Sequence, residues 1–125
     1  MRAALCREAG SIVVEEIDRP VPGAGEVLVR VRNCGSCGSD LHWWHGEMAI
    51  PSVCPGHEIA GEIAEIGPGV TDLRPGDRVA VEGVASCGTC RYCAAGSYHY
   101  CPTVGMTGMT VAGGFADYLR TPARH

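Results

Sequence analysis

Glycine and proline turns divide this 125-residue chain into short segments, and this division constrains the fold more than any other feature. With 18 Gly and 8 Pro, few uninterrupted stretches are long enough for a helix. The segments between the turns are short and apolar, several with alternating polar and apolar residues: Arg2–Cys6, Ile12–Ile17, Glu26–Asn33, Glu58–Ile66, Arg78–Glu82 and Phe115–Leu119. Such segments are typical of antiparallel strands, so the sequence predicts a mainly β fold arranged as a small antiparallel barrel.

The segment Glu26–Asn33 shows the alternation most clearly. Three valines share one face of this segment: Val27, Val29 and Val31. The arginines Arg30 and Arg32 lie on the other face. Leu28 is the exception on the arginine face, so we expect one buried and one mostly exposed face. In Glu58–Ile66 the spacing of the isoleucines shifts near Gly61, which predicts a bulge or bend there.

Size and charge exclude several classes of protein. A chain of 125 residues with 46% apolar content is expected to form one domain, residues 1–125, without needing disulfides. The net charge is -4, and the 10 basic residues form no stripe, which argues against a nucleic-acid partner. No apolar run approaches the roughly 18 residues of a membrane span, and Met1–Glu8 lacks the apolar segment of a signal peptide. We therefore expect a cytoplasmic protein without a membrane partner.

Four cysteines on one loop predict a structural metal site. They follow the pattern C-x2-C-x2-C-x7-C at Cys87, Cys90, Cys93 and Cys101, here named the four-cysteine lobe. Closed cages of four thiolates are the usual structural sites of zinc, and gaps of two residues turn successive sulfurs inward. An iron–sulfur centre is the main competing interpretation, and buried thiols or disulfides are a third.

A second cluster falls within the stretch from Gly35 to Glu58. Cys37 and His57 offer a thiolate and an imidazole from two separate turns, which would supply two ligands of a catalytic zinc. Such a site needs a third protein ligand and an open position. Asp40 is placed to orient a ligating imidazole.

The segment Ser39–His45 is expected to form a short helix capped by Ser39 or Asp40, with Cys37 at its positive end. Ser39 and His42 on this helix suggest a hydroxyl–imidazole proton relay, although His42 could also be a plain surface residue. Cys34 and Cys37 form a C-x-x-C, but no βαβ unit accompanies them, so a redox dithiol is disfavoured.

These motifs together resemble the zinc-dependent medium-chain alcohol dehydrogenases. The matching stretches are C-G-S-D-L-H at Cys37–His42, G-H-E at Gly56–Glu58, P-G-D-R-V at Pro75–Val79, G-G-F-A-D-Y at Gly113–Tyr118, and the four-cysteine lobe. In this order and spacing they cover nearly the whole chain. The text around C-G-S-D looks more like the polyol and threonine dehydrogenase branch than the ethanol enzymes.

The resemblance implies a GroES-like, partly open β-barrel with short helices and a zinc-binding four-cysteine lobe. It implies that Cys37 and His57 bind a catalytic zinc, and that Glu58 approaches this metal or contacts it through water. Ser39 would take the proton of the alcohol, and His42 would pass it toward solvent. In the same way Asp40 would brace His57.

The implied reaction is hydride transfer from a small alcohol, secondary or polyol, to NAD or NADP, with one catalytic and one structural zinc. The family binds its cofactor on a Rossmann domain, which this chain lacks. Gly23-x-Gly25 has Leu28 in place of a third glycine and precedes a strand. We expect a catalytic domain that is incomplete at its C-terminus, inactive alone, and part of a homo-oligomer, dimer or tetramer, when full length.

The rival hypothesis is a non-catalytic zinc-binding structural or interaction module with a GroES-like barrel. That module would need the four-cysteine lobe, but it gives no reason for Ser39, Asp40, His42 and His57 to occur together. Their co-occurrence favours the enzyme.

Overall fold

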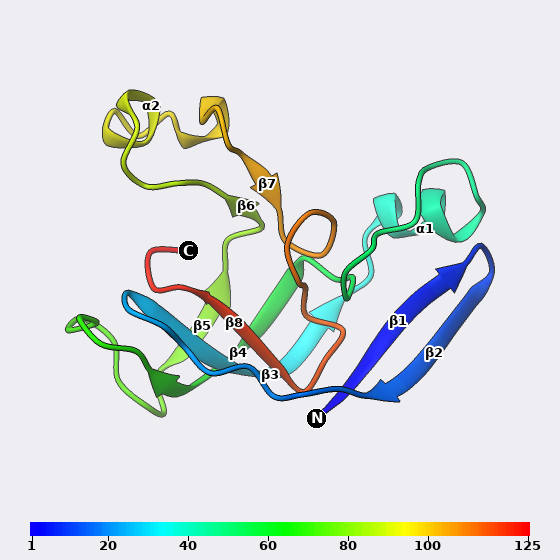
Figure 1. The fold of residues 1–125 in the computed structure, drawn as a ribbon, viewed down its shortest axis with the longest axis horizontal. Coiled ribbons are helices and arrows are strands. Elements are labelled where there is room, and N and C mark those ends of the chain that lie inside the picture. Colours follow the sequence, from blue (N-terminus) through cyan, green and yellow to red (C-terminus); the bar gives the residue numbers. More distant parts are fainter.

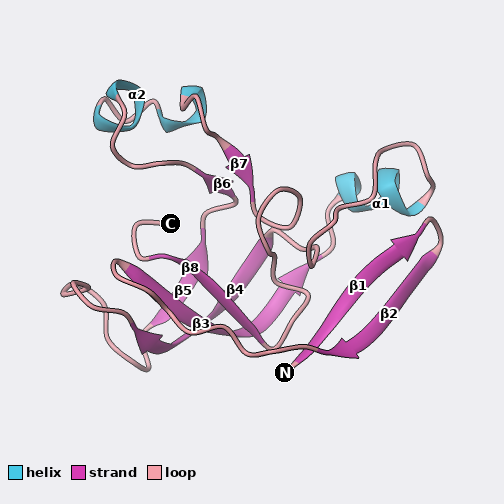
Figure 2. Ribbon diagram, in the orientation of Figure 1, coloured by secondary structure: helices cyan, strands magenta, loops and turns pink.

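A computed structural model describes residues 1–125, and strands dominate it (Figures 1 and 2). In chain order the elements are β1 Arg2–Glu8, β2 Ser11–Glu16, β3 Glu26–Gly35, α1 Gly38–Trp44, β4 Glu58–Ile66, β5 Arg78–Val81, β6 Val84–Ala85, α2 Arg91–Ala94, the 3-10 turn η1 Tyr98–Tyr100, β7 Gly105–Met106 and β8 Tyr118–Pro122. None of the helices has the length and apolar character of a membrane span.

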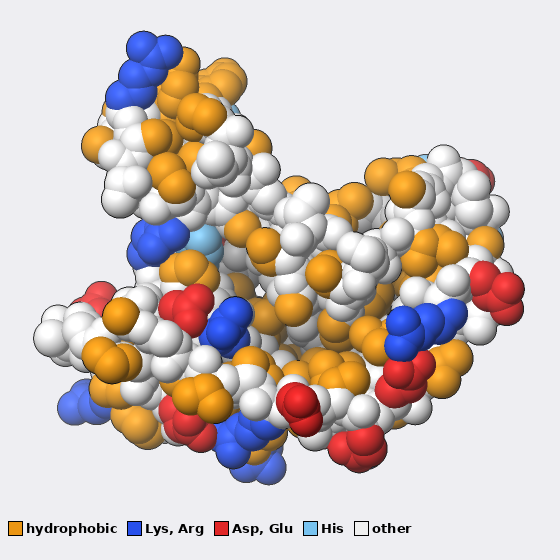
Figure 3. Space-filling model, viewed as in Figure 1, with side chains coloured by type: hydrophobic (Ala, Val, Ile, Leu, Met, Phe, Trp, Pro, Cys, Tyr) orange, Lys and Arg blue, Asp and Glu red, His pale blue; other side chains and the backbone are white.

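The strands form three antiparallel sheets that do not close into a single barrel. The central sheet has the order β5-β4-β3-β8, while β1 pairs with β2 and β6 pairs with β7. The four-cysteine lobe, with α2 and η1, extends away from the central sheet beyond β6 and β7 (Figure 1). Figure 3 shows the surface hollowed between this lobe and the part of the molecule that carries α1. The predicted mainly β, partly open fold with short helices is confirmed.

The core lies against β3, which contributes Val27 and Val29 to it. Val27, Val29, Ile63 and Val70 pack together there, and partly buried residues of β5 extend the cluster. Leu28 is 0% exposed, so at this end of β3 both faces are covered. The predicted exposed face therefore begins only at Arg30, with Arg32 also exposed and Val31 half-buried between them.

The pairing of β3 with β4 contains the predicted irregularity near Gly61. The register shifts between Val31, opposite Gly61, and Asn33, opposite Ala60, so that Arg32 is the extra residue. A side chain at Gly61 would overlap the carbonyl of Arg30, which explains why glycine stands there. A second shift lies between Leu28 and Val29.

The last strand starts later than the sequence suggests. Alternation predicts a strand over Phe115–Leu119, but β8 spans Tyr118–Pro122. The backbone of Phe115 has other partners: its N–H donates to the carbonyl of Pro55 at 2.9 Å, and its carbonyl accepts from Ala4 at 2.7 Å. The part of the prediction that begins the strand at Phe115 is therefore wrong, because tertiary contacts use that backbone.

Candidate functional site

Antiparallel pairing brings the first ligand cluster together. Cys37 follows the end of β3, and His57 directly precedes the start of β4. Gly35 and Glu58 are partners in the β3–β4 register, so these two turns meet at one edge of the sheet. One ligand atom from each of Cys37, His57 and Glu58 lies within 4.8 Å of the others. A thiolate, an imidazole and a carboxylate at this separation form a donor set that suits zinc.

The environment of this cluster is partly open to solvent. Cys37 and His57 are half-buried, and Glu58 is exposed. The Nδ1 atom of His57 is buried and has no hydrogen-bond partner. Buried polar atoms normally have a partner. An imidazole without one fits a residue that coordinates a bound group, such as a metal ion, that is not part of the polypeptide.

Gly35 leaves the space that the Glu58 carboxylate occupies. A Cβ at Gly35 would overlap Glu58 Oε2, so any larger residue would displace the carboxylate. The sequence analysis did not single out Gly35. Its role depends on the β3–β4 register, which the glycine alone does not reveal.

Asp40 holds Cys37 rather than His57. Its Oδ2 accepts the N–H of Cys37 at 2.8 Å, and its Oδ1 accepts the indole N–H of Trp43 at 3.2 Å. The expected hydrogen bond to His57 is absent. Asp40 is the third residue of α1, and a carboxylate there normally reaches back to the residue that caps the helix. That cap is Cys37, not Ser39 or Asp40 as expected.

Helix α1 presents the expected relay residues at neighbouring positions. Ser39 and His42 are three residues apart on the helix and therefore lie on the same side of it. The Nδ1 atom of His42 lies 2.6 Å from Glu47 Oε2, and both side chains are exposed. The hydrogen bond from His42 lowers the pKa of the Glu47 carboxyl below its usual value. The sequence analysis did not identify Glu47. The available signal was Gly46, because a glycine just after a short helix often turns the chain back over the end of the helix.

The four-cysteine lobe brings its sulfurs together as its spacing predicts. Ligand atoms of Cys87, Cys90, Cys93 and Cys101 lie within 4.8 Å of one another. All eight cysteines of the chain are free thiols, so the disulfide interpretation is wrong. Backbone N–H groups of Thr89 and Cys90 point at Cys87 Sγ and lower its pKa to about 5. Cys87 thus favours the thiolate, the form that binds metal.

Contacts from the end of the chain fix the lobe to the central sheet. The guanidinium of Arg124 donates to the carbonyl of Ser86 at 2.6 Å, and Nε2 of His125 accepts the N–H of Ser86 at 3.3 Å. Glycine is needed at position 88 for two reasons. A Cβ there would overlap the Arg124 side chain, and the φ of Gly88 is +76°, a conformation that other residues rarely adopt.

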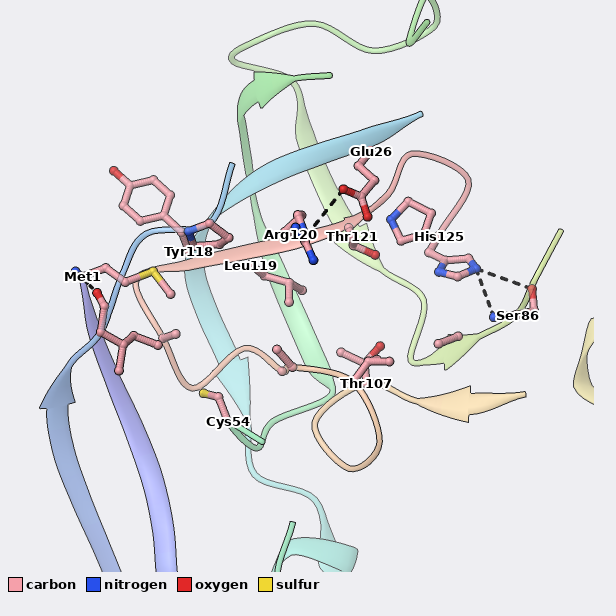
Figure 4. Close-up of a pocket in the computed structure, with 18 of the residues that line it drawn as sticks. Met1, Glu26, Cys54, Ser86, Thr107, Tyr118, Leu119, Arg120, Thr121 and His125 are labelled. Atoms are coloured by element: carbon pink, nitrogen blue, oxygen red, sulfur yellow. Dashed lines mark hydrogen bonds and ion pairs between the residues drawn. The ribbon is translucent and has the colours of Figure 1, made fainter. Parts of the chain in front are cut away.

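A pocket beside β8 reaches the four-cysteine lobe, since Cys87 is one of the residues that line it. It has a volume of about 510 Å³. Its lining includes Leu119 and Thr121 of β8, together with Cys54 and Thr107 (Figure 4). The hydrogen-bonded pair Ser86–His125 lies at one end of it. None of Cys37, His57 and Glu58 lines it. The chemistry of the donor set therefore identifies the candidate site better than the size of this pocket.

Comparison with known proteins gives consistent results. A family model described as the alcohol dehydrogenase GroES-like domain matches residues 23–125. The chain is 40% identical over 129 residues to L-threonine 3-dehydrogenase of Xanthomonas campestris pv. campestris, covering 98% of this chain and 38% of that protein. It is 41% identical over 128 residues to alcohol dehydrogenase of Geobacillus stearothermophilus, with the same two coverages, 98% and 38%.

Solved structures agree with these relatives. The alcohol dehydrogenase TADH from Thermus sp. ATN1 superposes with a TM-score of 0.90 at 36% identity, covering 98% of this chain and 37% of that one. An Escherichia coli CFT073 alcohol dehydrogenase complexed with NADH gives 0.89 at 40% identity, covering 99% and 36%. A cobalt- and zinc-bound alcohol dehydrogenase from Pyrobaculum aerophilum gives 0.85 at 36% identity, covering 99% and 40%.

The chain thus spans well under half the length of the relatives it matches. Its own residues carry the resemblance almost from end to end, including both ligand clusters. The chain belongs to the alcohol dehydrogenase GroES-like domain family, that of the zinc-dependent medium-chain alcohol dehydrogenases.

Proposed function

We propose that the protein containing this chain is a zinc-dependent oxidoreductase that transfers a hydride from a secondary alcohol or polyol to NAD or NADP. These 125 residues would form most of its catalytic domain. The observation that carries the proposal is the convergence of Cys37, His57 and Glu58 within 4.8 Å, beside a helix that presents Ser39 and His42.

Two metal sites follow from the two clusters. Cys37, His57 and Glu58 would hold a catalytic zinc, and the four cysteines of the lobe would hold a structural one. A catalytic zinc supplies Lewis-acid chemistry, which lowers the pKa of a hydroxyl bound to it. Asp40 would keep Cys37 in place through the N–H it accepts, so its contribution to metal binding is indirect.

The protein's own part in the reaction would be to move the alcohol proton. Ser39 would accept it from the substrate hydroxyl, and His42 would pass it onward. The side chain of His42 is 57% exposed, which suits delivery to solvent. Half-buried Cys37 and exposed His42 would thus mark the inner and outer ends of the site.

The cofactor would bind on a domain outside these residues. The chain contains no dinucleotide fingerprint, and it covers 36% of a relative solved with NADH. The relatives named L-threonine 3-dehydrogenase act on a secondary alcohol by their name, which supports that substrate class here. A cytoplasmic homo-oligomer is the assembly we propose for the full-length protein.

An alcohol-oxidation assay tests the proposal. The intact protein that contains this chain, supplied with zinc, is assayed for reduction of NAD and NADP with a panel of secondary alcohols, polyols and threonine. We expect Ser39→Ala and His57→Ala each to lower kcat/KM by roughly 100-fold or more, since proton transfer and a metal ligand contribute at that scale.

Ser52→Ala is the matched control, because Ser52 is an exposed serine near the same region of the chain and no role is assigned to it. It should retain full activity. Oxidation of no alcohol in the panel would favour the rival hypothesis of a non-catalytic zinc-binding module. Activity that survives His57→Ala would contradict the proposed role of His57 in the catalytic site.

A further inference from the structure

The end of helix α1 is built so that Glu47 lies against His42. Gly46 follows the helix with a φ of +78°, and its N–H donates to the carbonyl of Trp43 at 3.1 Å. The N–H of Glu47 then donates to the carbonyl of His42 at 2.7 Å. These two hydrogen bonds form a Schellman motif, in which the second residue after the C-cap, here His45, is brought over the residue whose carbonyl it caps.

The side chains repeat the contact that the backbone makes. An apolar pair usually accompanies a Schellman motif, whereas here Glu47 Oε2 lies 2.6 Å from Nδ1 of His42. Glu47 is therefore connected to His42 twice, once through its backbone and once through its carboxylate. This double connection separates the pair from an ordinary surface ion pair, whose side chains must be ordered without such help.

The carboxylate determines which ring nitrogen carries the proton. An ionised carboxylate only accepts hydrogen bonds, so Nδ1 of His42 must be the donor. In a neutral imidazole the other nitrogen, Nε2, is then the acceptor. His45 is the other titratable group beside Glu47, and it also favours the ionised carboxylate.

We infer that Glu47 is a positioning residue of the proton relay, which holds His42 in the Nδ1–H tautomer and so reserves Nε2 for the incoming proton. This inference rests on the proposed function. Nε2 gains the proton that Ser39 passes on, and the resulting imidazolium is paired with the Glu47 carboxylate. The imidazolium then releases one proton to water, which restores the neutral ring.

Nuclear magnetic resonance of the histidine side chains tests the inference without requiring activity. The zinc-loaded intact protein is labelled with 15N on histidine, and loss of a signal in His42→Asn assigns His42. We expect wild-type His42 to show the Nδ1–H tautomer. Glu47→Gln should keep it, because the amide oxygen still accepts, whereas Glu47→Ala should shift His42 toward Nε2–H. An Nε2–H tautomer in the wild type, or no change in Glu47→Ala, would overturn the inference.

The kinetic consequence gives a second, separable result. Glu47→Ala should lower kcat for alcohol oxidation about 5-fold and leave KM for the alcohol within about 2-fold, since the residue acts only through His42. Glu65→Ala is the control, because Glu65 forms an exposed ion pair with Arg19 elsewhere. An unchanged kcat despite a changed tautomer would overturn the inference. If the wild type oxidises no alcohol, the proposed function fails, and the tautomer measurement still decides whether Glu47 positions His42.

Discussion

At the scale of single residues, the geometry of the candidate site depends on neighbouring residues as much as on the candidate ligands themselves. Gly35 faces Glu58 across the β3–β4 pair, and Glu58 occupies the space that a Cβ would need. Asp40 does not reach His57 but stabilises the turn that presents Cys37. The geometry of the three candidate ligands is thus set by neighbouring residues outside the ligand set.

Gly35→Ala should weaken the catalytic site specifically. The added methyl displaces the Glu58 carboxylate, so we expect zinc affinity at this site to fall about 10-fold while the lobe keeps its metal. Competition with a chromogenic chelator measures both. Gly38→Ala is the control, since no atom lies within 4 Å of a Cβ built there. Equal affinities in the two variants would contradict this account of Gly35.

At the scale of elements, the approach to His57 is held by a short backbone ladder. N–H groups of Gly113, Gly114 and Phe115 donate to carbonyls of residues 54–56 at 2.7 to 2.9 Å. Gly113 lies so close to Pro55 and Gly56 that a Cβ would overlap their carbonyls. This ladder connects the G-G-F-A-D-Y motif to the turn that precedes His57.

Gly113→Ala should therefore destabilise the fold. Its Cβ meets backbone atoms that cannot rotate away, and overpacking of this kind costs about 1–3 kcal/mol. Chemical denaturation of the zinc-loaded protein measures the change, with exposed Ala112→Ser as the control. A variant as stable as the control would show that the segment can shift and that the ladder is not rigid.

How far the sequence predicts this structure depends on the range of the contacts involved. The spacing of the cysteines and the alternation in Glu26–Asn33 are local signals. They correctly predict that the four cysteines of the lobe lie together and that β3 is a strand. The start of β8 was misjudged because the backbone of Phe115 pairs with Pro55, far away in the chain. The contact between Glu47 and His42 is not predictable for a related reason. It forms because Gly46 adopts a positive φ, which turns the chain back over the helix.

At the scale of the whole molecule, two clusters of different character lie on separate parts of one open β framework (Figure 1). The closed set of four cysteines is fixed to the sheet by Arg124 and His125. The mixed set of Cys37, His57 and Glu58 lies where two strands meet and remains partly exposed. A closed thiolate cage suits structure, and a mixed, accessible set suits chemistry.

The measurement that tests this account most directly is zinc per chain, determined by elemental analysis of the intact protein and two variants. We predict two zinc ions in the wild type, one in Cys90→Ser and one in His57→Ala, because each change removes a ligand from a different cluster. Wild-type protein that is folded and contains no zinc would contradict the account, as would a single ion that persists in both variants.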